Sequence, residues 1–448
     1  MLSAELNEKI TRVGPGTPMG DLLRRYWFPI AGVSELLKHP TKSIRLLGED
    51  LTLYRDRSGN LGLIDAACAH RRVNMIFAIP EDNGLRCPYH GWLYDATGQC
   101  LEMPAEAPDS TFPQRVQMKS YPVQVLGGAV MAYLGPDPAP LIPHWDVFVK
   151  EGQVRDIGFA VVPCNWVQIM ENSLDPTHAE WLHRYYTNYA MERLDAAKDG
   201  KRFWRDPARV RRHSEIGFDA FEYGIVKRRV LEGDDKTNPN WRLGHPILFP
   251  NILRSGNGDT LQIRVPMDDT HTLYVYYSCY DMNADEQPQA DEDVPTYSVP
   301  IPGIGTDGLP QWDLIDHNAG QDNIAWMSQG LISDREAEKL GESDKGIILY
   351  RGMLQEQMQI VEDGGEPMNV FRDPSKNECI VTPYESMEGE MHTRSKAPSQ
   401  GEAMLSTGNS GKYSPIRRER ARKAGITLAD IPASAPIPAM AGTYTGSP

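Results

Sequence analysis

Apolar and polar residues alternate along short segments between Ser43 and about Pro140, the pattern of antiparallel strands with one buried face. The alternation is clearest in residues 44–66, IRLLGEDLTLYRDRSGNLGLIDA. Residues 48–50 and 58–60 interrupt it with Gly, Asp, Ser and Asn, which favour turns. We therefore expect an N-terminal domain built from antiparallel strands.

A different pattern begins after the proline-rich residues 137–144, DPAPLIPH, which we interpret as a linker. Residues 164–186 have the character of a long helix, and helical periodicity returns in residues 335–341 and 350–364. Strand patterns occupy residues 221–231, 261–267 and 272–282, and the turn at residues 268–271 joins the last two into a hairpin. The second domain is therefore expected to be an antiparallel sheet flanked by helices, so that the fold class is α+β.

The length of 448 residues allows two domains, each with its own core, and we place them at residues 1–144 and 145–385. Residues 386–448 form a polar tail with a basic run, RRERARK, and a Pro-, Ala- and Gly-rich end. We predict no regular structure for this tail.

Charge and cysteine usage exclude several classes of protein. The formal net charge of −15 disfavours nucleic acid and anionic membrane surfaces as partners. The six cysteines show no disulfide framework, which favours a reducing compartment. The first sixteen residues lack the apolar core of a secretory signal, and no run of about 18 apolar residues occurs. We expect a cytoplasmic protein.

Two short pairs of metal-binding residue types lie in residues 65–92. Cys68 and His70 form a Cys-x-His pair, and Cys87 and His90 form a Cys-x-x-His pair. Two cysteines and two histidines fit either a structural zinc ion or a Rieske [2Fe–2S] centre, in which Cys binds one iron and His the other. The spacing favours the Rieske centre, because zinc fingers usually pair Cys with Cys and His with His.

A second candidate site is Asp175-x-x-His178-x-x-x-x-His183, within the predicted long helix. On a regular helix the two histidines would project about 140° apart, which is too wide for one metal ion. Either they are unrelated, or the helix is distorted there, for example by a π-bulge near Asp175-Pro176. From the pattern alone, unrelated histidines are favoured.

The motifs together resemble those of the Rieske non-haem iron oxygenases. The resemblance covers CAHR (residues 68–71) and CPYHGW (87–92), their flanks at 45–65 and 121–140, ENSLDPTHAEWLH (171–183) and GQDNIAWMSQG (320–330). Ala69 stands where the family usually has Pro, a residue that stiffens the loop and is not a ligand. The resemblance implies a [2Fe–2S] cluster held by Cys68, His70, Cys87 and His90, and an Fe(II) ion held by His178, His183 and Asp322. From the residues, Asp322 could instead be a helix N-cap, and Asp313 and Asp316 are competing ligands.

The resemblance also gives Asp175 a role, as the residue that links a histidine of the iron site to a cluster histidine of the neighbouring subunit. Here the bridge would run from His178 through Asp175 to His90 of an adjacent chain. The alternative is that Asp175 is only an N-cap or turn residue before Pro. Electron transfer across an interface implies a homotrimer, or a hexamer of two stacked trimers.

Substrate and partners follow from the same resemblance. No dinucleotide-binding motif is present, so a separate NADH-dependent flavin or iron–sulfur reductase is implied. Residues 265–272 and 321–344 look most like the phthalate dioxygenase branch, which implies cis-dihydroxylation of an aromatic carboxylate such as a phthalate, isophthalate or halobenzoate. The alternative is a Rieske O-demethylase or monooxygenase acting on a methoxylated aromatic acid. Nine Lys or Arg residues occur in residues 201–229, and we take Arg242, expected on a strand, as the substrate-binding arginine. A third hypothesis, a non-enzymatic electron carrier or zinc-stabilised binding protein, leaves residues 150–448 unexplained.

Overall fold

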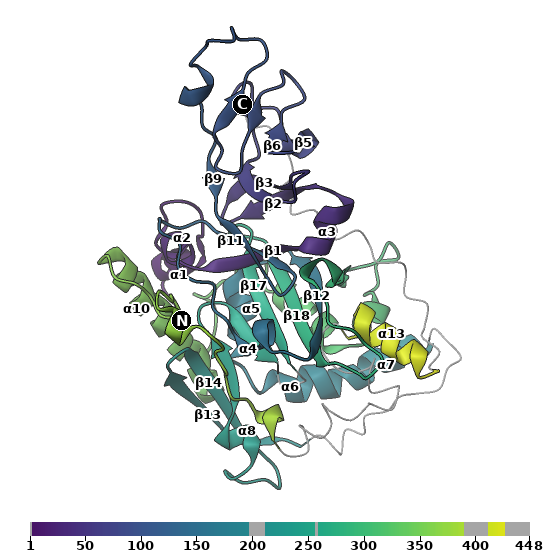
Figure 1. Ribbon diagram of the computed structural model, residues 1–448. Helices are drawn as coiled ribbons and strands as arrows, with labels where there is room; N and C mark the ends of the chain where they lie inside the picture. The colour runs from purple at the N-terminus through teal and green to yellow at the C-terminus, as the bar shows by residue number, and fades with distance from the viewer. Residues whose placement is uncertain (1, 197–210, 256–258, 389–410, 426–448) are drawn as a thin grey trace.

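The computed structural model describes residues 2–196, 211–255, 259–388 and 411–425 (Figure 1). A small lobe of short strands lies above a larger lobe built around one broad sheet, and the sheet containing β1 and β11 lies between them. No helix in these ranges is long and apolar enough to cross a membrane.

Three small antiparallel sheets make up the N-terminal part. Their strand orders are β1-β11-β10, β2-β3-β4-β9 and β5-β6-β7-β8. The predicted turns at residues 48–50 and 58–60 lie where β2 passes into β3 and β3 into β4. The strands span β1 Trp27–Gly32, β2 Thr41–Leu46, β3 Glu49–Arg55, β4 Leu61–Asp65, β5 Ile79–Glu81, β6 Gly84–Arg86, β7 Leu93–Tyr94, β8 Cys100–Glu102, β9 Ser120–Tyr121, β10 Val123–Leu126 and β11 Ala129–Tyr133.

An eight-stranded sheet forms the centre of the second part, with the order β13-β14-β15-β16-β17-β18-β12-β19. Its neighbouring strands are antiparallel except for the edge pair β12 and β19. The predicted hairpin is β17–β18. Because the sheet is mainly antiparallel and is accompanied by helices, the expected α+β fold class is confirmed. The strands span β12 Gln153–Val162, β13 His213–Phe221, β14 Gly224–Leu231, β15 His245–Leu248, β16 Ile252–Ser255, β17 Thr260–Pro266, β18 Thr272–Asp281 and β19 Thr296–Ser298.

The predicted long helix is broken into α5 (Trp166–Ser173), α6 (His178–Glu180), a π-helical turn η3 (Trp181–Tyr185) and α7 (Tyr186–Ala196). Pro176 lies in the break after α5. The other α-helices are α1 Ala4–Thr11, α2 Pro18–Leu23, α3 Val33–Lys38, α4 Asp146–Val149, α8 Pro239–Arg242, α9 Asn318–Met327, α10 Lys345–Glu362 and α13 Pro415–Lys423. Short 3₁₀ turns are η1 Met75–Phe77, η2 Pro113–Arg115, η5 Asp291–Asp293, η6 Trp312–Leu314, η7 Glu342–Asp344, η8 Pro374–Lys376 and η9 Glu385–Met387.

The two faces of the large sheet differ in polarity. Cross-strand partners carry their side chains on the same face, and the register from β14 to β18 groups five polar side chains on one face: Lys227, His245, Gln262, Arg264 and Tyr274. This polar face lies against the helices that carry the second candidate site, because the Tyr274 ring stacks on Trp326 of α9 at 5.3 Å. The opposite face, with Phe159, Ile263 and Val275, joins the main hydrophobic core.

The prediction of an unstructured tail is wrong for residues 411–425. Ser414 caps α13 by accepting a hydrogen bond from the Arg417 N–H, and its hydroxyl also bonds the buried carboxylate of Asp156 on β12. Arg420 forms an ion pair with Glu286 at 2.6 Å. The basic run is therefore a helix attached to the edge of the large sheet.

Candidate metal centres

The two cysteine loops have the same backbone conformation. In each, the N–H of Cys68 or Cys87 donates to the carbonyl five residues later, at 2.9 and 2.8 Å. The N–H four residues later returns to the cysteine carbonyl, and that residue has a positive φ, 61° at Arg72 and 75° at Gly91. Glycine adopts this conformation freely, whereas an arginine there is strained. The Cys-x-His and Cys-x-x-His pairs therefore lie on loops with the same backbone conformation, although their spacings differ.

The four side chains separate into a sulfur pair and an imidazole pair. Cys68 and Cys87 are 1% and 2% exposed. Burial and the neighbouring Cys68 thiol raise the pKa of Cys87. The rings of His70 and His90 lie 4.4 Å apart at the surface end of the loops, where His70 is exposed. The hydroxyl of Tyr94 lies 3.4 Å from the Cys68 Sγ.

This separation distinguishes a cluster from a zinc ion. A tetrahedral zinc ion needs all four ligand atoms within about 4 Å of one another. Among the described residues, the ligand atoms of the two Cys and two His do not form such a group even at 4.8 Å. Two sulfurs on one side and two imidazoles on the other are the donor set that a [2Fe–2S] centre of the Rieske type requires.

The π-helical turn brings the two distant histidines together. The N–H of Tyr186 donates to the carbonyl of Trp181, five residues earlier, in place of the usual four. The wider turn reduces the angle between residues five apart, and the rings of His178 and His183 lie with their centroids 4.9 Å apart and their planes at 81°. The distortion that a shared metal requires is present.

Asp322 completes a three-residue group. Its Oδ1 lies 3.2 Å from the His183 Nε2 and 3.7 Å from the His178 Nε2. Ligand atoms bound about 2.1 Å from one ion at right angles lie about 3 Å apart, so these separations fit three positions on one face of an iron ion. Asp322 Oδ1 is buried and has no hydrogen-bond partner in the described part of the chain, as expected for an oxygen that binds a cation.

The competing carboxylates lie elsewhere. Asp316 bonds to the His317 Nδ1 at 2.9 Å and to the Lys412 Nζ at 2.6 Å, and neither it nor Asp313 belongs to the group. The N-cap of α9 is His317, so Asp322 lies inside the helix and does not cap it.

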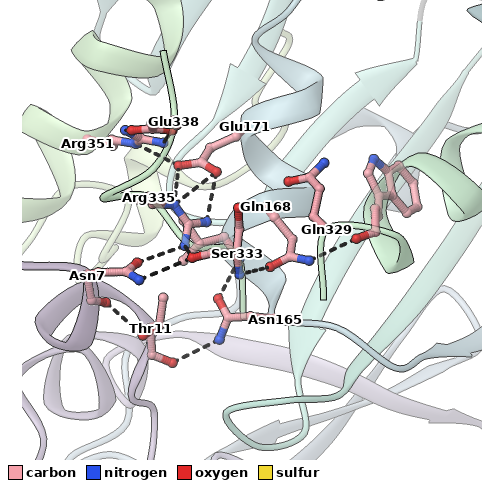
Figure 2. Close-up of polar contacts among 12 residues, drawn as sticks. Asn7, Thr11, Asn165, Gln168, Glu171, Gln329, Ser333, Arg335, Glu338 and Arg351 are labelled. Atoms are coloured by element: carbon pink, nitrogen blue, oxygen red, sulfur yellow. Dashed lines mark hydrogen bonds and ion pairs between the residues drawn. The ribbon is translucent and has the colours of Figure 1, made fainter. Parts of the chain in front are cut away.

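A buried polar network fixes α5, which leads into the histidine motif, against α9 and its following loop (Figure 2). The Gln168 side chain donates to the carbonyls at the end of α9, of Trp326 and Gly330, both at 2.9 Å. One turn further along α5, Glu171 accepts from Arg335 at 2.8 Å and from Arg351 at 2.7 Å. All three charges are less than 10% exposed, so removing one would cost about 3–5 kcal/mol. These contacts therefore fix the positions of the helical segments that carry His178, His183 and Asp322.

Asp175 lies beside the iron-site group. Its Oδ1 accepts from the Thr177 N–H at 2.7 Å and its Oδ2 lies 3.7 Å from the His178 Nδ1, which has no hydrogen-bond partner in the described ranges. Burial would raise the pKa of Asp175, but the His178 imidazole and the Thr177 donors hold it below its usual value. The side chain is 25% exposed, so it reaches the surface.

Arg242 was expected on a strand, and this prediction is wrong: Arg242 is the last residue of the short helix α8. Its guanidinium is half exposed and is paired with Glu388. The helix forms because Asn238 caps it and Pro239 occupies its first position. Of the other predicted cations, Lys201, Arg202, Arg205 and Arg209 lie outside the described residues.

Among the described residues, Lys227 and Arg264 are two buried cations close enough to Asp322 for the charges to interact. Lys227 is 7% exposed, and its one hydrogen bond within the described residues goes to the Ser173 carbonyl at 2.9 Å. Arg264 is 1% exposed and donates to the Ser173 hydroxyl at 2.8 Å. Burial, and then the charge of Arg229, lower the pKa of Lys227 to about 8. The alternation along β14 and β17 places both cations on the polar face.

Comparison with known proteins identifies a family for the N-terminal part and relatives along most of the chain. Residues 26–122 match the family model described as the Rieske [2Fe-2S] domain. The chain is 42% identical over 386 residues to the 5,5'-dehydrodivanillate O-demethylase oxygenase subunit of Sphingobium sp. (strain NBRC 103272 / SYK-6), which covers 86% of this chain and 87% of the relative. It is 39% identical over 351 residues to the 3-chlorobenzoate-3,4-dioxygenase oxygenase subunit of Comamonas testosteroni (76% and 78%). It is 29% identical over 395 residues to the phthalate 4,5-dioxygenase oxygenase subunit of Pseudomonas putida (81% and 88%).

Among solved structures, a variant of NdmA from Pseudomonas putida CBB5 with caffeine superposes with a TM-score of 0.55 at 20% identity, over 78% of this chain and 94% of that one.

Fold, donor sets and relatives define a terminal oxygenase that carries a [2Fe–2S] cluster and a mononuclear iron. The chain belongs to the Rieske non-haem iron oxygenases, in the group that contains the phthalate and chlorobenzoate dioxygenases and the dehydrodivanillate O-demethylase. Oxygenases of this family work with separate electron-transfer proteins. A stand-alone electron carrier or zinc-binding protein is excluded.

Proposed function

We propose that Cys68, Cys87, His70 and His90 hold the cluster and that His178, His183 and Asp322 hold the iron. When bound, the two centres supply electrons and a site at which O₂ reacts. The iron assignment is supported by the convergence of both imidazoles on the buried Asp322 Oδ1, which has no hydrogen-bond partner among the described residues. The paired sulfurs and paired imidazoles support the cluster assignment.

We further propose that electrons pass between subunits through Asp175, from His90 of a neighbouring chain to His178. Two exposed groups of large side chains support this interface: Phe77, Ile79 and Tyr89 near the cluster loops, and Trp181, Tyr185 and Tyr189 near the iron group. Exposed aromatic residues concentrated at two separate sites are typical of protein contacts. A cyclic trimer, or two stacked trimers, would bury both groups in every subunit.

Two inactive variants would test the interface. Cys87→Ser removes a cluster ligand, and His183→Ala removes an iron ligand, so each alone should be inactive. Co-expressed, they should recover about a quarter of parental activity, because half the subunits keep iron and half of their neighbours keep a cluster. Mixed trimers without activity would place electron transfer inside one subunit.

For the reaction, we propose O-demethylation of a methoxylated aromatic carboxylate. O₂, two electrons and two protons convert the aryl methyl ether into a phenol, formaldehyde and water. The sequence alone ranked cis-dihydroxylation first. The 42% identity to an O-demethylase subunit, over 86% of the chain, reverses that order. Electrons are proposed to come from NADH through a separate flavin or iron–sulfur reductase, as the family resemblance implied.

The second candidate is cis-dihydroxylation of a benzoate-type acid, in which both oxygen atoms add to the ring together with two electrons and two protons. The 39% identity to a chlorobenzoate dioxygenase subunit favours it. Both reactions need the same two metal centres, so they differ in how the substrate ring is placed over the iron.

We propose that Lys227, rather than Arg242, binds the substrate carboxylate. Within the described residues the buried Lys227 ammonium makes one hydrogen bond and has two further N–H donors, which a carboxylate could accept from. Arg264 and Arg229 add positive charge nearby, whereas the Arg242 guanidinium is already paired with Glu388 at the surface. This proposal keeps the predicted substrate class and changes the residue.

The deciding experiment is oxygen uptake by iron-loaded protein with a surrogate NADH reductase. The panel contains methoxybenzoates, the same acids without the methyl ether, and the methyl esters of both. Formaldehyde equal to the oxygen consumed, from methoxylated acids alone, is the expected result. Dihydrodiol products from acids that have no methoxy group would establish the second candidate. Equal turnover of acids and esters would contradict carboxylate recognition.

A further inference from the structure

Gln321 is a fully buried residue next to Asp322 on α9, and sequence patterns gave it no role. Its side chain makes three hydrogen bonds. The Nε2 donates to the Ile315 carbonyl at 3.0 Å and to the Thr187 hydroxyl at 2.9 Å, and the Oε1 lies 3.0 Å from the His183 Nδ1.

These contacts determine which way the amide faces. The Ile315 carbonyl can only accept, so the NH₂ end of the Gln321 side chain must point toward it. The amide oxygen therefore faces the His183 ring. An amide oxygen can only accept, so the ring nitrogen opposite it must carry a proton.

The protonation of the second nitrogen follows for the neutral ring. With the proton on Nδ1, the lone pair of His183 is on Nε2, the atom that lies 3.2 Å from Asp322. That is the form of an imidazole that binds a metal ion through Nε2. Gln321 and Asp322 are successive residues of α9 and contact opposite edges of the same ring.

We propose that Gln321 is a positioning residue that fixes the orientation and the tautomer of His183 for iron binding. This inference rests on the proposed iron site. The Ile315 and Thr187 contacts orient the amide, the amide orients the imidazole, and the imidazole presents Nε2 to the iron position. His178 differs, because its Nδ1 has no hydrogen-bond partner within the described residues.

Two substitutions of similar size separate this role from simple packing. Gln321→Glu keeps an acceptor opposite the His183 Nδ1, whereas Gln321→Met keeps the volume and removes the acceptor. Gln329→Met is the matched control, because Gln329 is exposed just after the same helix and its side chain bonds only to the Ala325 carbonyl within the described part of the chain. Each purified variant is stripped of mononuclear iron and titrated with Fe(II), and then with Co(II), whose visible spectrum reports coordination. The cluster spectrum reports folding.

The expected order of affinity is parent, then Gln321→Glu, then Gln321→Met, with a 10- to 100-fold loss for Met. Gln329→Met should match the parent. Equal losses in the Glu and Met variants, or parental affinity in Gln321→Met with an intact cluster spectrum, would overturn the proposal. His183→Ala, titrated alongside, keeps the two questions apart: parental affinity in that variant would refute the iron site itself.

Discussion

The Nε2 of His183 and the Oδ1 of Asp322 lie 3.2 Å apart, although one residue belongs to a π-helical turn and the other to the middle of a distant helix. Nothing in either local sequence requires the two to meet. They meet because Gln168 and Glu171 of α5 tie the end of α9 and its following loop to the helix that leads into the histidine motif. The first prediction depends on this contact.

His183→Ala should lose the mononuclear iron and keep the cluster. The substitution removes one of the three proposed ligands, while the two cluster cysteines lie in a separate hydrophobic core. Metal analysis should show the loss of about one iron in three, and the visible spectrum should be unchanged. A bleached spectrum would contradict two independent sites.

Asp175→Asn should keep both metal centres and nearly abolish turnover. Asn retains the size and can still accept from Thr177, but it lacks the charge that the proposed bridge places between two imidazoles. Reduction of the cluster by the reductase should stay fast while reoxidation by O₂ with substrate becomes slow in stopped-flow measurements. Loss of iron would instead make Asp175 a residue of the metal site.

Tyr94→Phe should lower the reduction potential of the cluster. The Tyr94 hydroxyl lies 3.4 Å from the Cys68 sulfur, and a donor to a ligand sulfur stabilises the reduced, more negative form. A shift on the order of 60 mV corresponds to about 1.4 kcal/mol for one electron. An EPR-monitored redox titration measures it. Tyr89→Phe is the control, since the Tyr89 hydroxyl bonds to Arg71 at the surface, and an equal shift there would refute the explanation.

Lys227→Met should raise the KM for an aromatic acid at least tenfold, about 1.4 kcal/mol, and leave the KM for its methyl ester nearly unchanged. The reason is that the substitution removes the buried Lys227 ammonium, which is proposed to bind the substrate carboxylate. Arg242→Leu should leave both values unchanged, because its guanidinium is half exposed and paired with Glu388. Steady-state kinetics of the two variants on the matched pair decide between the two cations.

The KM for the acid should also rise with pH. Burial and Arg229 lower the pKa of Lys227 to about 8, while the carboxylates of Asp175, Glu385 and Asp322 oppose them. Below that pH the side chain is an ammonium ion, and above it the amine is neutral and no longer attracts an anion. In Lys227→Arg the rise should be absent, since a guanidinium stays charged. An identical profile in that variant would mean that another group titrates.

The sequence could suggest the cysteine–histidine and histidine motifs because each lies within one short segment, whereas the choice of Asp322 depended on the resemblance to a family. The five-residue spacing of His178 and His183 left two alternatives, unrelated histidines or a π-type distortion, and the pattern alone favoured the first. The structure has the distortion. Gln321 was missed because its proposed role depends on contacts with Ile315, just after η6, and Thr187 of α7, which no spacing within one segment encodes.

The wrong predictions have identifiable physical causes. Residues 335–341 were expected to be helical, but Arg335 is held in a buried ion pair with Glu171 and its segment forms turns. Helices α8 and α13 were missed although each begins with a capping side chain followed by Pro, at Asn238-Pro239 and Ser414-Pro415. That signal is legible in sequence and should have outweighed the polar composition around it.

The His178 Nδ1, which has no hydrogen-bond partner within the described ranges, is the atom at which the proposed bridge through Asp175 would reach the iron site. With electrons crossing between subunits as proposed, a subunit separated from its neighbours by dilution would keep its iron and its cluster but lose the path from a neighbour's cluster to its iron. On that proposal the iron of a separated subunit would receive no electrons, so dissociation would stop the reaction of O₂ at the iron and would not release peroxide from it.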